Sequence, residues 1–269
     1  VSTGGYMSLP LCIASKILNI KIFLFEPNMV LGRSNRLFIN HCEKIFCYSD
    51  TIKNFPNEFI NKIIVIPALL RKKFYEVKKA EVIGEYINLL IIGGSQGAKI
   101  FDTLVEASII EISKKYKLKI YQQTNSINFN NIKKFYQDMN VDYELFDFNE
   151  DISKIMSRSN LCITRAGAST LAELVFLNVP CVTIPLPSSK DNHQFENAFY
   201  YNKNGCNWIL NQNEISKKTV ADKLLNIINN KSEYLAKKMK MKNFSYQNTW
   251  NNINQKIISV INENRISKN

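Results

Sequence analysis

Residues 88–98 read NLLIIGGSQGA, an apolar run that leads into a glycine-rich turn. The run predicts a buried strand, and the residues after the turn show helical spacing over 98–113. Glycines let the backbone approach a ligand closely, and the free N–H groups of a helix N-terminus attract phosphate. The stretch lacks the spacing of the dinucleotide fingerprint and the lysine of a P-loop, so a plain tight turn is the alternative interpretation.

Strand and helix patterns alternate on both sides of this stretch. Apolar, β-branched runs predict strands at 20–25, 44–48, 118–122, 143–146, 161–164 and 180–184. Helical spacing lies between most of them, at 8–18, 128–138, 168–178 and 192–203, and continues near 216–229, 231–242 and 246–262. Such alternation predicts an α/β protein with parallel sheets and crossover helices.

The length of 269 residues favours two domains. A polar stretch at 72–85 predicts the boundary, and we divide the chain into 1–78, 79–245 and 246–269. The first region holds few strands and begins without Met, so we expect an incomplete N-terminal domain. The last helix has apolar residues on one face, which predicts packing against a neighbouring domain.

The formal net charge of +12 suits a nucleic acid or an anionic membrane surface as partner. Scattered lysines are more typical of a solvated face, and no interleaved arginine and aromatic pattern indicates a nucleic-acid groove. The six cysteines are isolated and only two histidines are present, which predicts buried, reduced thiols and no metal site. No apolar run approaches the roughly 20 residues of a membrane span.

A second helix opening follows the predicted strand 161–164, in the segment ITRAGASTLAE at 163–173. Two such openings in one domain could face a single diphosphate. Glu173 lies one turn into the helix, where its carboxylate can accept hydrogen bonds from a ribose diol. The alternative is that Glu173 only complements the helix dipole.

Three further segments carry candidate polar groups. In PLPSSKDNHQFENA, at 185–198, Gln194 and Asn197 are three residues apart and could jointly bind sugar hydroxyls, although capping explains the same residues. TGGYMSLP, at 3–10, is another glycine turn before a helix, and Glu26 to Asn28 follow a strand end. We expect His41 and His193 to be packed or exposed rather than catalytic.

The segments TGGYMSLP, FEPNMVLGRSNR, IIGGSQGA, ITRAGASTLAE and PLPSSKDNHQFENA, in this order, resemble the MurG family over nearly the whole chain. That family transfers N-acetylglucosamine (GlcNAc) in peptidoglycan synthesis. The resemblance implies a GT-B fold, in which two Rossmann-like domains with parallel sheets face each other across a cleft. It places the nucleotide-sugar in the C-terminal domain and the lipid acceptor toward the N-terminal one, with the C-terminal helix packing back on the N-terminal domain.

The resemblance also implies site residues. Its donor-side contacts to UDP-GlcNAc are Asn28, Arg71, Gly94, Ser95, Gln96, Asn149 through its backbone, Ala168, Ser169, Thr170, Glu173, Gln194 and Asn197. Tyr6, Glu26 and Asn35 would line the acceptor side, with Glu26 as the candidate base. The family usually reads GNPVR where this chain reads PALLR at 67–71, and its GGTGGH loop with a candidate base histidine is absent.

The implied reaction is an inverting transfer of GlcNAc without metal or cofactor. It runs from UDP-GlcNAc to the C4 hydroxyl of undecaprenyl-linked N-acetylmuramoyl-pentapeptide, which converts lipid I to lipid II. The expected location is the cytoplasmic face of the bacterial inner membrane, as a peripheral protein. Two other hypotheses stay open: a non-catalytic UDP-sugar-binding half of a split glycosyltransferase, and a basic nucleic-acid-binding protein.

Overall fold

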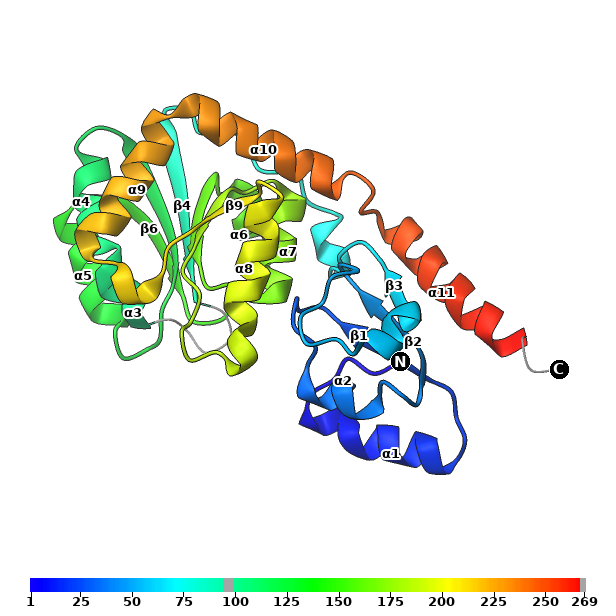
Figure 1. Cartoon of the computed structure of the whole chain (residues 1–269). Coiled ribbons are helices and arrows are strands. Elements are labelled where there is room, and N and C mark those ends of the chain that lie inside the picture. Colours follow the sequence, from blue (N-terminus) through cyan, green and yellow to red (C-terminus); the bar gives the residue numbers. More distant parts are fainter. Residues whose placement is uncertain (94–98, 267–269) are drawn as a thin grey trace.

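Two parallel sheets organise the chain, as Figure 1 shows. The computed structural model describes residues 1–93 and 99–266. The smaller sheet has the order β1-β2-β3, formed by Ile22–Glu26, Cys42–Cys47 and Ile63–Val65. The larger sheet has the order β6-β5-β4-β7-β8-β9, and its strands in chain order are Tyr86–Ile92, Lys117–Gln123, Asp142–Phe146, Leu161–Thr164, Cys181–Thr183 and Asn207–Ile209. The α/β class with parallel sheets is thus confirmed.

The helices cross between these strands and then extend beyond them. The smaller sheet carries α1 (Leu9–Ile17) and α2 (Arg33–Phe38). The larger sheet carries α3 (Lys99–Leu104), α4 (Glu106–Ser113), α5 (Phe129–Asp138), α6 (Ile152–Arg158), α7 (Ala168–Leu177), α8 (His193–Lys203), α9 (Lys217–Asn229) and α10 (Lys231–Ser245). The one helix predicted over 98–113 is therefore two, and the last helix, α11 (Trp250–Ile266), begins later than 246.

Two hydrophobic cores fill the molecule. One lies wholly in the larger unit, where buried residues of β4, β5 and β7 pack against α3, α4, α5 and α9. The other is continuous from the small sheet to the opposite face of the large one, and it includes Leu24, Phe46, Leu90 and Leu174. Since one apolar cluster spans both units, their relative placement is fixed by packing as well as by the linker.

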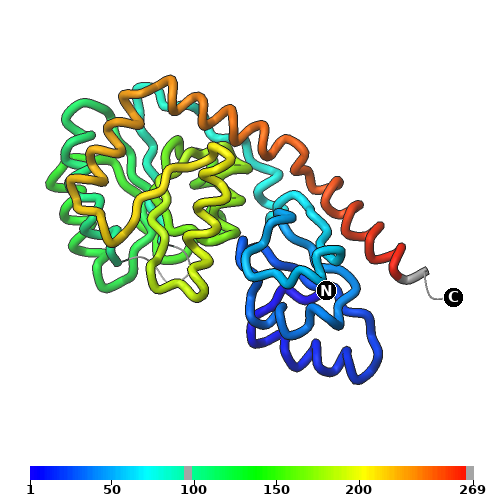
Figure 2. Tube along the Cα trace, in the orientation of Figure 1, coloured from blue at the N-terminus to red at the C-terminus, as the bar shows by residue number. Residues whose placement is uncertain are grey.

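The C-terminal helix returns to the small sheet, as Figures 1 and 2 show for the red end of the chain. Ile257, Val260 and Ile261 of α11 pack against the shared core. At the turn before the helix, Asn248 accepts a hydrogen bond from the Tyr75 hydroxyl and donates one to the Ala68 carbonyl. The expected packing of the tail on the N-terminal unit is confirmed.

The linker between the two units is fastened by a buried lysine. Lys238 of α10 donates hydrogen bonds from Nζ to the carbonyls of Ala80, Glu81 and Asn178, at 2.9, 3.2 and 2.7 Å. Burial lowers the pKa of Lys238 to about 8. The Ala80 N–H also donates to the Leu177 carbonyl, so the linker is held against the end of α7.

All six cysteines are buried and unbridged. Within residues 1–93 and 99–266, no helix has the length and apolar character needed to cross a membrane.

Candidate functional site

The segment that the sequence predicts to bind the nucleotide is the N-terminus of α7. Gly167 occupies the cap position and no side chain caps the helix, so its first N–H groups face outward from the carboxyl end of β7. Ala168, Ser169 and Thr170 form this first turn, and Glu173 follows it. Such an opening offers hydrogen-bond donors and a positive dipole to an anion.

Glu173 is a buried carboxylate that pairs with Arg71. The residue is 8% exposed, and its Oε1 accepts a hydrogen bond from Arg71 Nη2 at 3.2 Å. Desolvation raises the pKa of Glu173 to about 6, although the charge of Arg71 acts in the opposite direction. The carboxylate is therefore costly to keep ionised in the folded protein.

Arg71 reaches this carboxylate from the N-terminal side of the linker. It precedes the 3₁₀ turn Lys72–Phe74, and its guanidinium lies 5.1 Å from the centre of the Phe74 ring. The structure thus brings Arg71 and Glu173 together, although the residues before Arg71 depart from the family pattern.

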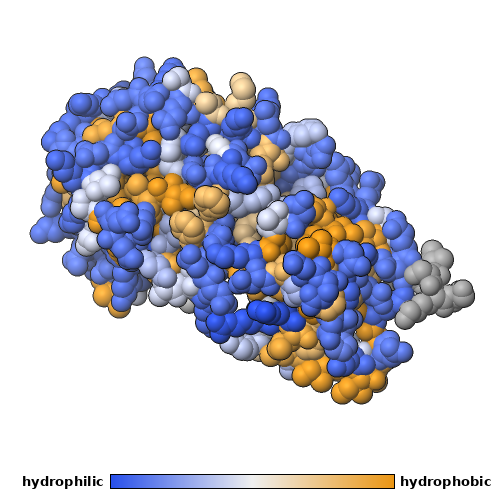
Figure 3. Space-filling view, in the orientation of Figure 1, coloured by the Kyte–Doolittle hydropathy of each residue, from blue (hydrophilic) through white to orange (hydrophobic). Residues whose placement is uncertain are grey.

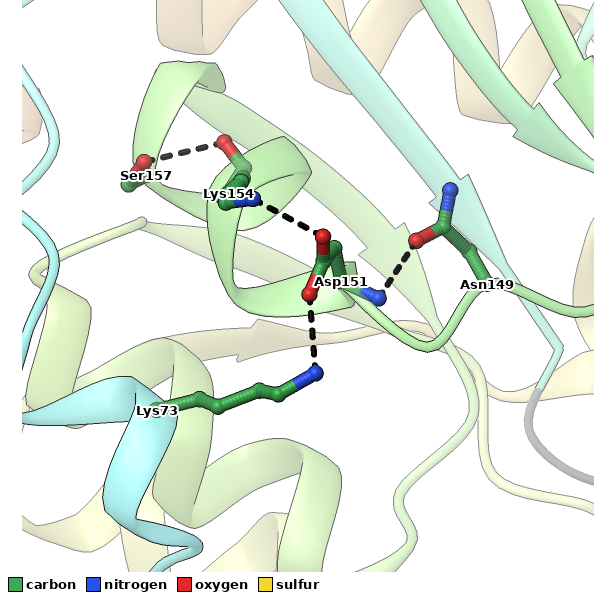
Figure 4. Close-up of polar contacts among 5 residues, drawn as sticks. All are labelled: Lys73, Asn149, Asp151, Lys154 and Ser157. Carbon is green, nitrogen blue, oxygen red and sulfur yellow. Dashed lines mark hydrogen bonds and ion pairs between the residues drawn. The ribbon is translucent and has the colours of Figure 1, made fainter.

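Asn149 lies in the turn that opens α6, as Figure 4 shows. Its Oδ1 accepts a hydrogen bond from the Asp151 N–H at 2.7 Å. Asp151 pairs with Lys154 at 2.8 Å and with Lys73 of the linker at 2.9 Å, and hydrogen bonds from these two lysines lower the pKa of Asp151 to about 2. The Asn149 side chain is thus used inside the turn, which leaves its backbone groups as the candidates for a ligand contact.

The segment that the resemblance assigns to the acceptor centres on Glu26, which is 2% exposed at the end of β1. Its Oε1 accepts from the N–H and the side-chain amide of Asn28, at 3.2 and 3.1 Å. Its Oε2 accepts from the Gly32 N–H and from Asn35 Nδ2, at 2.7 and 2.9 Å. Four donors match the roughly four lone-pair sites of a carboxylate, so Glu26 holds its own loop in shape. No lone pair is left for an acceptor hydroxyl unless one of these bonds breaks.

Two neighbours of Glu26 complete this loop. A side chain at Gly32 would place its Cβ 2.9 Å from Glu26 Oε2, so only glycine lets the backbone come so close to the carboxylate. Asn35 is buried, and its Nδ2 also donates to the Phe25 carbonyl at 3.0 Å. Among the described side chains, Asn35 Oδ1 is one of the buried atoms without a hydrogen-bond partner.

A pocket of about 320 Å³ lies in front of this loop. It brings Tyr6, Glu26, Asn28 and Asn35 together with three residues of the larger unit, Lys190, Asp191 and His193. Tyr6 is 74% exposed at its edge. The acceptor-side residues implied by the resemblance therefore line one pocket, which both units form.

Gln194 and Asn197 are both engaged within the protein. Gln194 Oε1 accepts a hydrogen bond from the Leu186 N–H at 2.9 Å. Asn197 is 1% exposed; its Oδ1 accepts from the Met29 N–H at 2.9 Å, and its Nδ2 donates to Asn28 Oδ1 and to the Ala166 carbonyl, each at 3.1 Å. Their contact with a sugar stays a prediction, because these amides now serve the loop and the domain interface. Gly94, Ser95 and Gln96 lie outside the described residues.

Several polar contacts at the interface had no signal in the sequence. Arg33 pairs with Asp191 through two hydrogen bonds of 3.0 Å, and Lys53 pairs with Glu196 at 2.6 Å. Asp191 and Asn192 have φ of 52° and 56°, so both lie in the left-handed region. In this turn the Asp191 carboxylate contacts Arg33 of the small unit. Pairs between residues more than 140 positions apart leave no local pattern, so the sequence could not predict them.

Arg165 is a second residue that the sequence analysis did not single out. Its Nη1 donates to the Ile184 carbonyl at 2.8 Å and to Gln212 Oε1 at 2.6 Å, and its guanidinium lies 5.3 Å from the centre of the Phe101 ring. Burial lowers the pKa of Arg165. Its position directly after β7, within the RAGAS segment, was the available clue.

Comparison with known proteins identifies the fold and family. The model of the glycosyltransferase family 28 C-terminal domain matches residues 88–255. The UDP-N-acetylglucosamine--N-acetylmuramyl-(pentapeptide) pyrophosphoryl-undecaprenol N-acetylglucosamine transferase of Pelagibacter ubique is 67% identical over 98% of this chain and 74% of its own length. The enzyme of the same name from Rickettsia canadensis is 38% identical over 86% of this chain and 66% of its own length.

Among solved structures, Acinetobacter baumannii MurG aligns with a TM-score of 0.75 and 25% identity, over 98% of this chain and 74% of that one. A Neisseria meningitidis UDP-GlcNAc 2-epimerase aligns at 0.60 with 14% identity, a likeness of fold alone. The GT-B arrangement of two parallel α/β units is confirmed. Together, the family model and the relatives show that this chain belongs to the MurG family of glycosyltransferases.

Proposed function

We propose that the chain transfers GlcNAc from UDP-GlcNAc to lipid-linked N-acetylmuramoyl-pentapeptide, by inversion and without a metal. The observation that carries this proposal is the pair Arg71 and Glu173 beside the open N-terminus of α7, at the interface of the two units. We take residues 1–78 as the acceptor-side domain, 79–245 as the nucleotide-binding domain and 246–269 as the returning tail.

The nucleotide would bind along α7. Ala168, Ser169 and Thr170 offer N–H groups to the diphosphate, and the carboxylate of Glu173 accepts the ribose hydroxyls. Arg71 then loses its present partner and becomes free to contact the diphosphate. Asn149 would meet the uracil through its backbone, beside the turn that Asp151 fastens to the linker. Gly94, Ser95 and Gln96 would add further diphosphate contacts.

The acceptor would enter the pocket lined by Tyr6, Asn28 and Asn35. Its C4 hydroxyl attacks the anomeric carbon of GlcNAc, and the bond from that carbon to the diphosphate oxygen breaks. Negative charge then gathers on the departing UDP, where the N-terminus of α7 supplies a fixed positive dipole. In this scheme Glu26 positions Asn28 and Asn35 before the reaction; one of these hydrogen bonds then breaks, and the freed carboxylate oxygen takes the proton of the attacking hydroxyl.

We also propose peripheral attachment to the cytoplasmic face of the inner membrane, where anionic lipid meets the acceptor. The support is an exposed apolar surface on and around α1, formed by Tyr6, Met7, Leu11, Ile13, Ile17, Leu18 and Leu37. Figure 3 shows hydrophobic colouring gathered at the lower right, where Figure 1 places α1. Lys16 belongs to the same segment, is exposed and favours an anionic surface. No nucleic acid is part of this proposal.

Calorimetric titration with UDP and UDP-GlcNAc tests the donor site. We expect both to bind the folded chain with one site. Glu173→Gln should weaken the binding of both ligands. Its matched control is Glu111→Gln, because Glu111 is a surface carboxylate of α4 in the same domain and pairs with Lys114. Failure of both ligands to bind at millimolar concentration, in a sample shown to be folded, contradicts the proposal.

Transfer of radiolabelled GlcNAc to a soluble lipid I analogue tests the reaction itself. Product formation that depends on both substrates supports the transferase. Binding of UDP-GlcNAc without any transfer favours instead the non-catalytic UDP-sugar-binding role.

Vesicle flotation tests the membrane proposal. We expect the chain to float with vesicles containing phosphatidylglycerol and to float less after Leu11→Ser with Ile17→Ser. Met239→Ser, which removes an exposed apolar side chain from α10 in the other domain, is the control. Equal flotation with neutral vesicles at high salt removes the electrostatic part of the argument.

A further inference from the structure

Hydrogen bonds and ion pairs join the loop after β1, together with Lys53, to the start of α8 across the domain interface. On the small unit are Asn28, Met29, Arg33 and Lys53; on the large unit are Asp191, Glu196 and Asn197. We call these seven residues the clasp. Three of its residues, Asn28, Arg33 and Asp191, also line the pocket that contains the proposed acceptor-side residues.

The centre and the edges of the clasp differ in chemistry. At the centre, the buried Asn197 amide accepts from the Met29 N–H and donates to Asn28 and Ala166, so separating the units would leave buried polar groups without partners. At the edges, the basic members of the pairs Arg33–Asp191 and Lys53–Glu196 are more than half exposed to solvent, and their carboxylates are partly exposed. Exposed ion pairs weaken as salt rises.

Two neighbouring hydrogen bonds belong to the small unit alone. The Leu31 N–H donates to the Lys53 carbonyl at 3.0 Å, and the Lys53 N–H donates to the Met29 carbonyl at 2.8 Å. These bonds persist when the units separate, whereas the bond from the Met29 N–H to Asn197 does not. The Met29 amide is therefore a direct reporter of the interface.

We propose that Asn197, Arg33 and Asp191 are positioning residues, which set the acceptor-side loop against the nucleotide-binding domain through a salt-sensitive clasp. The clasp opens as a unit: the two edge pairs separate, and the Met29 amide then leaves Asn197. Only the naming of the pocket as the acceptor side rests on the proposed function; the opening itself does not depend on it.

Amide hydrogen exchange of the full chain, followed by NMR, tests this inference. In Asp191→Asn we expect the Met29 amide to exchange about 2–5-fold faster than in the wild type, the scale of losing one exposed ion pair. The Leu31 and Lys53 amides should keep their rates. Raising NaCl from 0.05 to 0.5 M should speed Met29 exchange in the wild type and have less effect in Asp191→Asn.

Two further variants separate the clasp from general destabilisation. The conservative variant Arg33→Lys should keep the Met29 rate within about twofold of the wild type, because it retains the opposite charges and leaves the left-handed turn at Asp191 unchanged. Glu111→Gln, which removes an ion pair inside α4, should leave the rate unchanged. An unchanged Met29 rate in Asp191→Asn overturns the proposal, as does an equal rise at Met29, Leu31 and Lys53. If the wild-type chain does not bind UDP-GlcNAc, the proposed function is refuted, but the result of the exchange experiment still stands.

Discussion

The two regions proposed to hold the acceptor and the nucleotide each contain a buried carboxylate, and the two carboxylates differ in what surrounds them. Glu26 accepts four hydrogen bonds from its own loop, so its charge is compensated within the fold. Among the residues that the structure describes, Glu173 has one hydrogen-bond partner, Arg71, and burial raises the pKa of Glu173 to about 6. A carboxylate with satisfied oxygens stabilises a structure, whereas one that is desolvated without enough donors is held ready for a ligand.

The largest effect expected from this contrast is on folding at Glu26. In Glu26→Gln, one carboxylate oxygen becomes an NH₂ group that faces the two N–H donors which that oxygen accepted. Two hydrogen bonds are lost, and N–H groups are brought into repulsive contact. We expect the free energy of unfolding to fall by about 3 kcal/mol, measured by urea denaturation. The surface variant Glu111→Gln should stay within about 0.5 kcal/mol of the wild type. A similarly small change in Glu26→Gln would show that the four hydrogen bonds contribute nothing net.

At Glu173 the main effect should be on ligand binding. Glu173→Gln keeps the size of the side chain but removes the charge that would accept the ribose hydroxyls. We expect affinity for UDP-GlcNAc to weaken by about 1.5–3 kcal/mol, measured by calorimetry at pH 7.5. Unchanged affinity would mean that Glu173 only complements the dipole of α7.

The same substitution should make the fold more stable. The pKa of Glu173 is raised on folding from 4.5 to about 6, so ionisation at neutral pH costs about 2 kcal/mol of folding free energy. We expect Glu173→Gln to raise the free energy of unfolding by about 1–2 kcal/mol at pH 7.5.

The pH dependence gives the sign of this effect. A raised carboxyl pKa contributes stability that is fully present below pH 4.5 and is lost as the pH rises through about 6. The advantage of Glu173→Gln over the wild type should therefore shrink as the pH falls from 7.5 toward 4.5. A variant that is less stable than the wild type at pH 7.5 would show that the pair with Arg71 outweighs the desolvation.

The smallest effect is expected at Lys73, the linker partner of Asp151 in Figure 4. Lys73→Gln removes one of two lysines from an exposed carboxylate, and Lys154 is retained. Exposed pairs contribute little, so we expect UDP-GlcNAc affinity within about twofold of the wild type. A much larger loss would mean that the linker, and not only α7, sets the geometry of the nucleotide site.

Much of the fold could be predicted because buried parallel strands are local apolar runs. The runs at 88–92 and 161–164 match β4 and β7 closely, since both are buried on their two faces. Ile63–Val65 and Asn207–Ile209 were missed; both are three-residue strands at a sheet edge, whereas the equally short Cys181–Thr183 lies inside the sheet and is fully buried. The helix predicted over 98–113 divides at Val105, which caps α4, and no glycine or proline marks that position.

The candidate site could be predicted only in part. The glycine turns and Glu173 follow strand ends, and the sequence shows this directly. The pairing of Arg71 with Glu173 and the ties from Asn197 to Asn28 and Met29 join residues about 100 or more positions apart, which no local pattern encodes. The use of both Glu26 oxygens likewise depends on how the loop folds back on itself.

The account depends most on Glu173 being an ionised group that the nucleotide needs, and the pH dependence of donor binding tests this directly. UDP-GlcNAc is the right probe, because its diphosphate has no terminal phosphate monoester to titrate near pH 6. We predict that wild-type affinity is constant above pH 7 and about tenfold weaker at pH 5, one unit below the raised pKa of Glu173, which is about 6. Glu173→Gln should bind weakly and equally at both values; parallel pH profiles for the two proteins would contradict the account.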